Sequence, residues 1–295
     1  MLDGRSEIKR KLPLRLVVAG GWLILLTLAA IFAPWIAPKD PLAQDLFLGQ
    51  LPPVWLQGHE PGYYLGTDSL GRDVLSRILY GARLALTVAL IAGSITCIIG
   101  AGLGLLAGFL RGWVDLLISR AIDIWMAFPP VLFSILLIAV LGPGLMSIII
   151  AIVVIDWTRF ARVIRAEAMA QGAMDYVASA QVAGRGRLST MITEILPNVL
   201  PTIVVLLTLE MGIAIIVEAI LSFVNLSIST DDPTWGGMIA EGRTSIHQAW
   251  WVLVFPLITL FLTVLSFSQL GEGFKDRFDP VLRCAFCPSA TCRHR

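Results

Sequence analysis

The stretch that decides the fold is DYVASAQVAGRGRLSTMITEILPN, residues 175–198, a polar segment between two long apolar ones. Asp175 suits a helix N-terminus, because its carboxylate can accept hydrogen bonds from free backbone N–H groups and favours the positive end of the helix dipole. Gly184 suits a helix end, because glycine adopts the left-handed conformation there at little cost. The pattern therefore predicts a helix over 176–183 with Asp175 as its N-cap.

A helix of about two turns is marginal alone in water, so contacts with other parts of a protein must order it. The residues within and after it are small or basic: Ala178, Ser179, Ala180, Ala183, Arg185 and Arg187. Small side chains would let the helix backbone sit deep in a cleft. The stretch therefore predicts a segment that docks onto a partner protein, and an ordinary amphipathic loop is the alternative.

The spacing of this stretch resembles the coupling loop of ABC importer permeases. Ala178-Ser179-Ala180 is followed by Gly184 and, twelve residues further on, by Leu196-Pro197. In that family the loop contains a coupling helix that docks into a groove on the cytoplasmic ATPase. The resemblance implies an ATPase-coupling role for Asp175, Tyr176, Ala180, Gly184, Arg185, Leu196 and Pro197. Two residues depart from the family pattern: Ala178 replaces its glutamate, and Glu194 replaces an apolar residue.

Composition places the rest of the chain in a membrane. Of 295 residues, 57% are hydrophobic and only 15% are charged. The hydrophobic fraction is higher than a soluble domain needs, so the composition indicates a polytopic membrane protein. The expected fold is an all-α membrane protein with six transmembrane helices and a cytoplasmic coupling helix. The net charge of +1 predicts no nucleic-acid partner, and membrane lipid is the expected surrounding. The six apolar segments are 14–33, 84–110, 124–141, 145–160, 199–223 and 251–270.

These segments define the expected organisation. A cleaved signal peptide is the alternative for the first apolar run, which is longer than a usual h-region and is followed by Pro34, Trp35 and Pro38. The boundaries expected are a cytoplasmic N-terminus at 1–13, a first span at 14–36, an external loop at 37–83, a transmembrane domain at 84–280 with the coupling loop at 166–198, and a cytoplasmic tail at 281–295.

A second motif, LGTDSLGRDVLSR at residues 65–77, lies in the predicted external loop. Thr67 and Asp68 favour turns or caps, Gly71 permits a tight bend, and Arg72 and Asp73 can pair. The motif resembles the segment before the second span in permeases of the dipeptide, oligopeptide and nickel importers. The resemblance implies that the outer face is shaped by Gly66, Thr67, Asp68, Gly71, Arg72 and Asp73. A catalytic role for the acids and Arg72 is the alternative, but no His or Cys nucleophile is nearby.

Polar and small residues inside the apolar segments carry further predictions. Gly100, Gly104 and Gly108 repeat every four residues, a spacing that predicts close approach of two membrane helices, with simple tolerance of glycine in lipid as the alternative. Glu210 and Glu218 lie eight residues apart in the fifth apolar segment. Carboxylates are costly in hydrocarbon, so both should face the bundle interior, a partner subunit or an aqueous pathway. A structural hydrogen-bonding role and a substrate contact remain alternatives for them.

The resemblance extends over nearly the whole chain, through 232–238, 241–243 and 271–280. After the fifth segment the family usually has glycines where this chain has Asn225 and Ser227. The last dozen residues fall outside the resemblance. They contain Cys284, Cys287, Cys292 and His294, a weak zinc-like pattern with no second half-site, so we expect an extension without a metal.

Basic residues predict the orientation. Seventeen lysines and arginines fall in the N-terminus, the connector at 111–123, the segments around the coupling loop and the C-terminus, whereas five fall in the other connecting segments. Positive charge favours the cytoplasmic side, so the coupling loop and both termini are expected there. The expected location is the bacterial cytoplasmic (inner) membrane.

The resemblance also implies a function. The chain is similar to the second permease subunit of peptide or nickel importers, which pairs with a homologous permease, two cytoplasmic ATPases and an extracytoplasmic binding protein. It would form the pathway for di- and oligopeptides, with nickel, opines and glycosides as alternative substrates. No P-loop and no nucleophile or metal motif occurs in the body of the chain. We therefore expect no catalytic residue, metal or cofactor here, with ATP and magnesium used by the partner ATPases.

Two functions from other classes remain as alternatives. An ion-coupled secondary transporter would use Glu210 and Glu218 as relay groups, and it would transport without an ATPase. An intramembrane hydrolase would use Asp123, Asp156 or the two glutamates, although no paired catalytic motifs are visible. The secondary transporter gives no reason for the pattern at 175–198.

Overall fold

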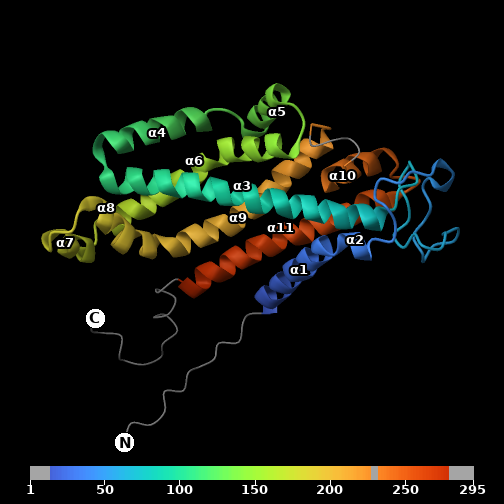
Figure 1. Ribbon diagram of the computed structural model, residues 1–295, viewed down its shortest axis with the longest axis horizontal. Coiled ribbons are helices and arrows are strands. Elements are labelled where there is room, and N and C mark those ends of the chain that lie inside the picture. Colours follow the sequence, from blue (N-terminus) through green and yellow to red (C-terminus); the bar gives the residue numbers. More distant parts are fainter. Residues whose placement is uncertain (1–13, 227–231, 279–295) are drawn as a thin grey trace, which may run out of the picture.

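The computed structural model describes residues 14–226 and 232–278, and within these ranges the regular structure is helical. Long helices run side by side along the molecule (Figure 1). The irregular segment 37–73 lies at one end of this bundle, together with α10, and α7 lies at the other end. We call these the loop end and the α7 end. The predicted tail at 281–295 and the first thirteen residues lie outside the described ranges.

The helices follow the apolar pattern of the sequence. Short helices occur mainly at the ends of the bundle, and Met191–Ile195 forms a π-helical turn that leads directly into α9. The helices are α1 Leu14–Ile31, α2 Ala33–Ile36, the 3-10 turn η1 Leu46–Leu48, α3 Val74–Leu110, α4 Gly112–Met126, α5 Pro130–Leu141, α6 Leu145–Gln171, α7 Asp175–Val182, α8 Arg187–Thr190, the turn η2 Met191–Ile195, α9 Leu196–Phe223, α10 Trp235–Thr244 and α11 Trp250–Phe278.

Four of the described helical segments are long and apolar enough to cross a membrane: Leu14–Ile31, Val74–Leu110, Arg187–Phe223 and Trp250–Lys275. A fifth arises if α4 and α5 together make one span. The predicted span that does not qualify is the fourth, 145–160, which corresponds to α6 and carries Asp156, Arg159 and Arg162 within the first eighteen residues of that helix. The all-helical membrane fold is therefore confirmed, but the count of six spans is not.

The predicted third span is wrong as a single straight helix. Residues 111–123, expected to be a connector, belong largely to α4, and α4 and α5 meet at 87°. Pro129 and Pro130 explain the break, because proline removes a backbone donor and disfavours helical conformation in the residue before it.

Small residues allow α3 and α6 to pack closely against each other. Gly100, Gly104 and Gly108 on α3 face the backbone of α6, so the predicted close approach is confirmed. A Cβ atom added at Gly104 would lie 2.7 Å from the backbone oxygen of Ala161. Helices in lipid gain no hydrophobic driving force from one another, so this kind of tight packing stabilises their association.

The chain leaves α9 through a residue with left-handed backbone. Asn225 has φ +58°, a conformation that asparagine tolerates better than most residues. This explains how Asn225 can stand where the resembling family usually has glycine. Ser227 lies outside the described residues.

Candidate functional site

Helix α7 forms almost where the sequence predicts it. It spans Asp175–Val182, but its N-cap is Met174, so the prediction of Asp175 as N-cap is wrong. The backbone N–H groups of Val177 and Ala178 both donate to the carbonyl of Met174, which starts the helical hydrogen bonds one residue earlier. Asp175 remains in the first turn, where its charge suits the helix dipole.

Gly184 ends α7 as predicted, with φ +84°. Its N–H donates to the carbonyl of Gln181 at 3.0 Å, and the N–H of Arg185 donates to the carbonyl of Ala180 at 3.2 Å. These two bonds form a Schellman motif, which satisfies carbonyls that a helix end otherwise leaves free. Ala180 and Gly184 therefore have defined roles in closing the helix.

One face of α7 packs on the bundle and another is open. Val177 is buried with Ile195 and Val199, so α7 is anchored at the start of α9. Tyr176 also turns inward, because its hydroxyl donates to Gln171 Oε1 at 2.8 Å. Val182 is 89% exposed. Other exposed apolar side chains of this end are Met174, Leu188 and Ile192. The α7 end thus presents an uncovered apolar surface.

An ion pair holds the turn after α7. Arg185 NH1 donates to Glu194 Oε1 at 2.6 Å and to Thr193 Oγ1 at 2.7 Å. Glu194 is one of the two residues that depart from the family pattern, and the structure shows Arg185 as its partner. The only sign of this ion pair in the sequence is that Arg185 and Glu194 have opposite charges and lie nine residues apart. Of the other predicted coupling residues, Leu196 begins α9 and is half-buried, and Pro197 is exposed.

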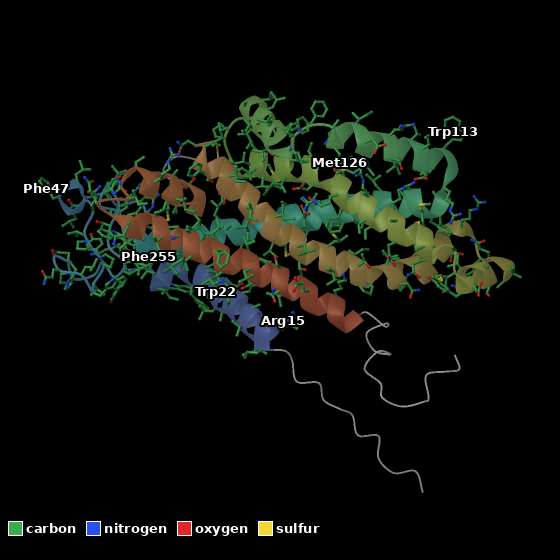
Figure 2. All side chains as sticks on the ribbon, turned by 180° about the vertical axis from the view of Figure 1, so that it is seen from behind. Arg15, Trp22, Phe47, Trp113, Met126 and Phe255 are labelled. Carbon is green, nitrogen blue, oxygen red and sulfur yellow. The ribbon has the colours of Figure 1, made fainter. Side chains whose placement is uncertain are left out.

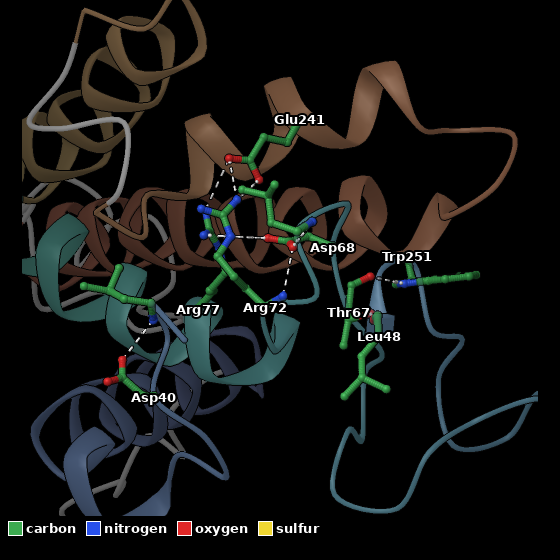
Figure 3. A network of polar contacts seen from close by, with 10 residues as sticks. Asp40, Leu48, Thr67, Asp68, Arg72, Arg77, Glu241 and Trp251 are labelled. Atoms are coloured by element: carbon green, nitrogen blue, oxygen red, sulfur yellow. Dashed lines mark hydrogen bonds and ion pairs between the residues drawn. The ribbon is translucent and has the colours of Figure 1, made fainter. Parts of the chain in front are cut away.

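The second motif builds a buried charge network at the loop end (Figure 3). Arg72 Nε donates to Asp68 Oδ2 at 2.6 Å, and Arg72 NH2 donates to both carboxylate oxygens of Glu241 at 2.8 and 2.9 Å. Arg77 lies 3.7 Å from Asp68 and 3.5 Å from Glu241. Burial opposes the charge of Arg72, but the carboxylates of Asp68 and Glu241 outweigh it and raise the pKa of the guanidinium. The network joins the loop to α10.

The predicted pairing of Arg72 with Asp73 is wrong. Asp73 is instead the N-cap of α3, and its Oδ2 accepts hydrogen bonds from the backbone N–H and the hydroxyl of Ser76, at 2.8 and 2.6 Å. Burial raises the pKa of the Asp73 carboxyl, and these bonds oppose that rise. Because Asp73 caps α3, its side chain turns toward the start of that helix and not toward Arg72.

Thr67 and the two motif glycines fix the loop itself. Thr67 Oγ1 accepts from the backbone of Leu51 and donates to the carbonyl of Leu48. Gly66 and Gly71 have φ +79° and +74°. A Cβ atom at Gly66 would collide with the backbone oxygen of Leu51, and one at Gly71 with that of Asp45. All six motif residues thus build one rigid corner. Asp68, Arg72 and Asp73 are each at most 2% exposed, which favours a structural role over a catalytic one.

Replacement of Trp251 by phenylalanine is expected to cost about 1 kcal/mol of unfolding free energy, the usual net value of one hydrogen bond. Trp251 Nε1 donates to the carbonyl of Thr67 at 3.1 Å and so ties α11 to this corner. Thermal unfolding of the detergent-purified protein would measure the effect. Trp250→Phe is the control, since Trp250 is 40% exposed, and an equal loss in both variants would contradict the prediction.

The two glutamates of the fifth apolar segment lie near the middle and the end of α9. Glu210 and Glu218 are both buried, at 2% and 1% exposure, as predicted for carboxylates in a bundle interior. They do not share a partner. Glu218 accepts a hydrogen bond from Ser222 on its own helix, whereas Glu210 lies 3.9 Å from Arg159 on α6. Sequence reasoning missed Arg159 as that partner.

Comparison with known proteins now identifies the family. Residues 100–283 match the binding-protein-dependent transport system inner membrane component family, and residues 15–53 match the N-terminal transmembrane domain of oligopeptide transport permease C. The chain belongs to this family. It is a multi-pass inner-membrane permease of the ABC importer type, as the motifs predicted.

Relatives align with the permease over most of both lengths. A di/tripeptide transport system permease protein of Pseudomonas aeruginosa is 40% identical over 90% of this chain and 87% of its own. A dipeptide transport system permease of Haemophilus influenzae is 37% identical over 89% of each chain. A glutathione transport system permease of Pectobacterium atrosepticum is 36% identical over 95% of this permease and 91% of its own length.

Proposed function

We propose that this chain forms the translocation pathway for di- and oligopeptides in an ABC importer. The observation that carries the proposal is α7, a short helix fixed between α6 and α9 with an uncovered apolar surface, in a chain of the permease family. Such a helix suits a groove on a partner protein. Its Schellman C-cap and the packing of Val177 on α9 keep it helical before it docks. The names of the relatives favour a peptide as the solute.

The partners proposed are a homologous permease, two cytoplasmic ATPases and an extracytoplasmic binding protein. In this arrangement the α7 end faces the cytoplasm, both termini lie on the cytoplasmic side, and the loop end receives the binding protein. Closure of the ATPases upon ATP binding would push on α7. Because α7 packs on the start of α9 through Val177, that push would tilt α9 and the helices packed on it. ATP hydrolysis would take place in the partner subunits alone.

Uptake by proteoliposomes tests this function. The chain is co-purified with the products of neighbouring transport genes and reconstituted, and uptake of labelled dialanine is measured with binding protein outside and ATP inside. We expect uptake that requires both. Uptake that continues without ATP and follows an ion gradient would instead support a secondary transporter and overturn the proposal.

Gly184→Ala is expected to reduce ATP-dependent uptake several-fold while leaving the fold intact. An alanine in left-handed backbone costs roughly 1 kcal/mol, and it would distort the turn that presents α7. Gly186→Ala is the matched control: Gly186 has φ −65°, and an added Cβ meets nothing within 4 Å at either glycine. Equal uptake by the two variants would contradict a role for the left-handed turn.

A further inference from the structure

Two buried carboxyl groups join α6 to α9 near the middle of both helices. Asp156 on α6 and Glu210 on α9 are 7% and 2% exposed, and their side chains are hydrogen-bonded to each other. Met126, which lines a small hollow together with Asp156 and Arg159, lies between the two ends of the bundle (Figure 2). The pair is therefore placed inside the bundle and away from the loop end and the α7 end.

The contact between these two acids points to a proton. A hydrogen bond needs a hydrogen atom on one of its two groups, and two ionised carboxylates have none. Among the described residues, no N–H or hydroxyl group donates to the buried Oε1 of Glu210. Two carboxyl groups that share a site do not both ionise readily, because their like charges repel strongly away from water. These observations favour a proton on one of the two carboxyls.

Arg159 balances the charge that remains. Its NH2 donates to Asp156 Oδ1 at 2.8 Å, and its NH1 lies 3.9 Å from Glu210 Oε2. With one proton between them the two carboxyls carry one negative charge, which the guanidinium neutralises. In the described part of the chain, the other titratable group that faces the pair is the thiol of Cys97 on α3. Charged groups nearby have partners of their own: Arg162 with Asp123, Arg165 with Asp115, and Glu218 with Ser222.

The pair connects the two helices that flank α7. Helix α6 ends at Gln171, α7 begins at Asp175, and the chain then returns through α8 and η2 into α9. Apolar side chains also pack between α6 and α9, among them Phe160, Ile164, Val199 and Ile203. Apolar packing is non-directional and lets helices slide, whereas a hydrogen bond between side chains fixes their register. The pair is therefore placed to make α6 and α9 move as one unit.

We propose that Asp156 and Glu210 hold one proton between them and that this bond locks α6 to α9, so that both helices follow α7. The consequence for uptake rests on the proposed function, whereas the shared proton does not. Loss of the proton to water leaves two negative charges facing one guanidinium, and their repulsion opens the lock. Arg159 gives water a route to the pair, because its side chain is 44% exposed.

Infrared spectroscopy of the purified importer tests the proton directly. A protonated carboxyl has a carbonyl absorption that ionised carboxylates lack and that shifts in heavy water. We expect Glu210→Gln and Asp156→Asn each to remove one such band, because either amide leaves a single carboxylate that Arg159 keeps ionised. Glu218→Gln is the matched control, since this buried acid bonds to Ser222 on its own helix, and it should leave the band of the pair in place.

Glu210→Gln leaves the bond between Asp156 and Arg159 in place, so it decides the result if Asp156→Asn does not assemble with its partners. A spectrum that Glu210→Gln leaves unchanged would overturn the proposal.

The dependence of stability on pH counts the proton. Unfolded carboxyls ionise near about pH 4, so at about pH 6 to 8 only the folded form holds the proton, and its stability falls as the pH rises. The equilibrium constant for unfolding should increase by up to about tenfold per pH unit in the wild type relative to Glu210→Gln, whose amide cannot lose its hydrogen. Equilibrium unfolding in mixed detergent micelles measures both forms. The same pH dependence in both would contradict a shared proton.

The role of the lock is tested by the ratio of dialanine carried to ATP hydrolysed in proteoliposomes. Glu210→Ala removes the link between α6 and α9 and should lower this ratio several-fold, whereas Glu210→Gln still donates a hydrogen bond to Asp156 and should retain it. Glu218→Ala is the control, because it removes an equally buried acid whose bond stays within α9.

Equal ratios in Glu210→Ala and Glu218→Ala would overturn the lock. A wild-type importer that takes up no dialanine with ATP would contradict the proposed function, while the infrared and unfolding results would still decide whether the pair shares a proton.

Discussion

Arg72→Ala is expected to lower the free energy of unfolding by about 3 kcal/mol, because breaking a buried ion pair leaves a buried charge without its partner. Arg72 is 2% exposed and binds Asp68 and Glu241, which come from two different segments of the loop end. Its removal leaves Asp68, 1% exposed, without its closest partner. A buried carboxylate without its partner is costly, and here its loss also frees α10 from the loop.

Thermal unfolding in detergent would measure this loss. Arg83→Ala is the matched control, because Arg83 lies on α3 within eleven residues of Arg72 and is exposed. Exposed substitutions usually change stability by less than about 0.5 kcal/mol. A second variant, Glu241→Gln, keeps the hydrogen-bonding shape and should cost less than Arg72→Ala. Arg72 and Arg83 variants of equal stability would contradict the assignment of the network as structural.

Gly104→Ala is expected to destabilise the permease by about 2 kcal/mol, because it overpacks the contact between α3 and α6. The new methyl group would lie 2.7 Å from the carbonyl oxygen of Ala161 and 3.1 Å from the backbone nitrogen of Arg165. Backbone of a long helix cannot move aside as a side-chain end can, so the two helices must separate.

Gly102→Ala is the control for this prediction. Gly102 is on the same helix, and a Cβ atom there meets nothing within 4 Å. Gly102→Ala should therefore be neutral, or stabilising by up to about 1 kcal/mol, since alanine is the better helix former. Comparison of both variants by thermal unfolding separates packing from helix propensity. Equal losses in the two would show that α3 and α6 do not pack as described.

Much of this fold could be predicted from local patterns. Apolar runs predict the long helices, the glycine repeat predicts the contact between α3 and α6, and Gly184 predicts the end of α7. Each of these predictions succeeds because it depends on residues that are close in sequence. The bend between α4 and α5 was the main failure. Pro129 and Pro130 were visible, but an apolar stretch continuing beyond them looked the same as one straight span.

Long-range partners were the part that the sequence could not provide. Arg72 was paired with its neighbour Asp73, whereas its partner Glu241 lies 169 residues away. Nothing local distinguishes these two acids, since the choice depends on how α10 packs against α3. Likewise, Glu210 was recognised as a costly buried acid, but its neighbour Arg159 belongs to another helix, and only the packing of α6 and α9 brings them together.

Co-purification of the ATPases tests the central claim, that α7 couples this permease to an ATPase. The tagged chain is co-expressed with its neighbouring transport genes and purified in mild detergent, as wild type and as Val182→Arg. Val182 is 89% exposed, so the substitution changes the surface of α7 and not its packing. We predict that ATPase subunits accompany the wild type and are lost from the variant, while the second permease remains. Undiminished recovery of the ATPases with Val182→Arg, or no ATPase with either form, would contradict the account.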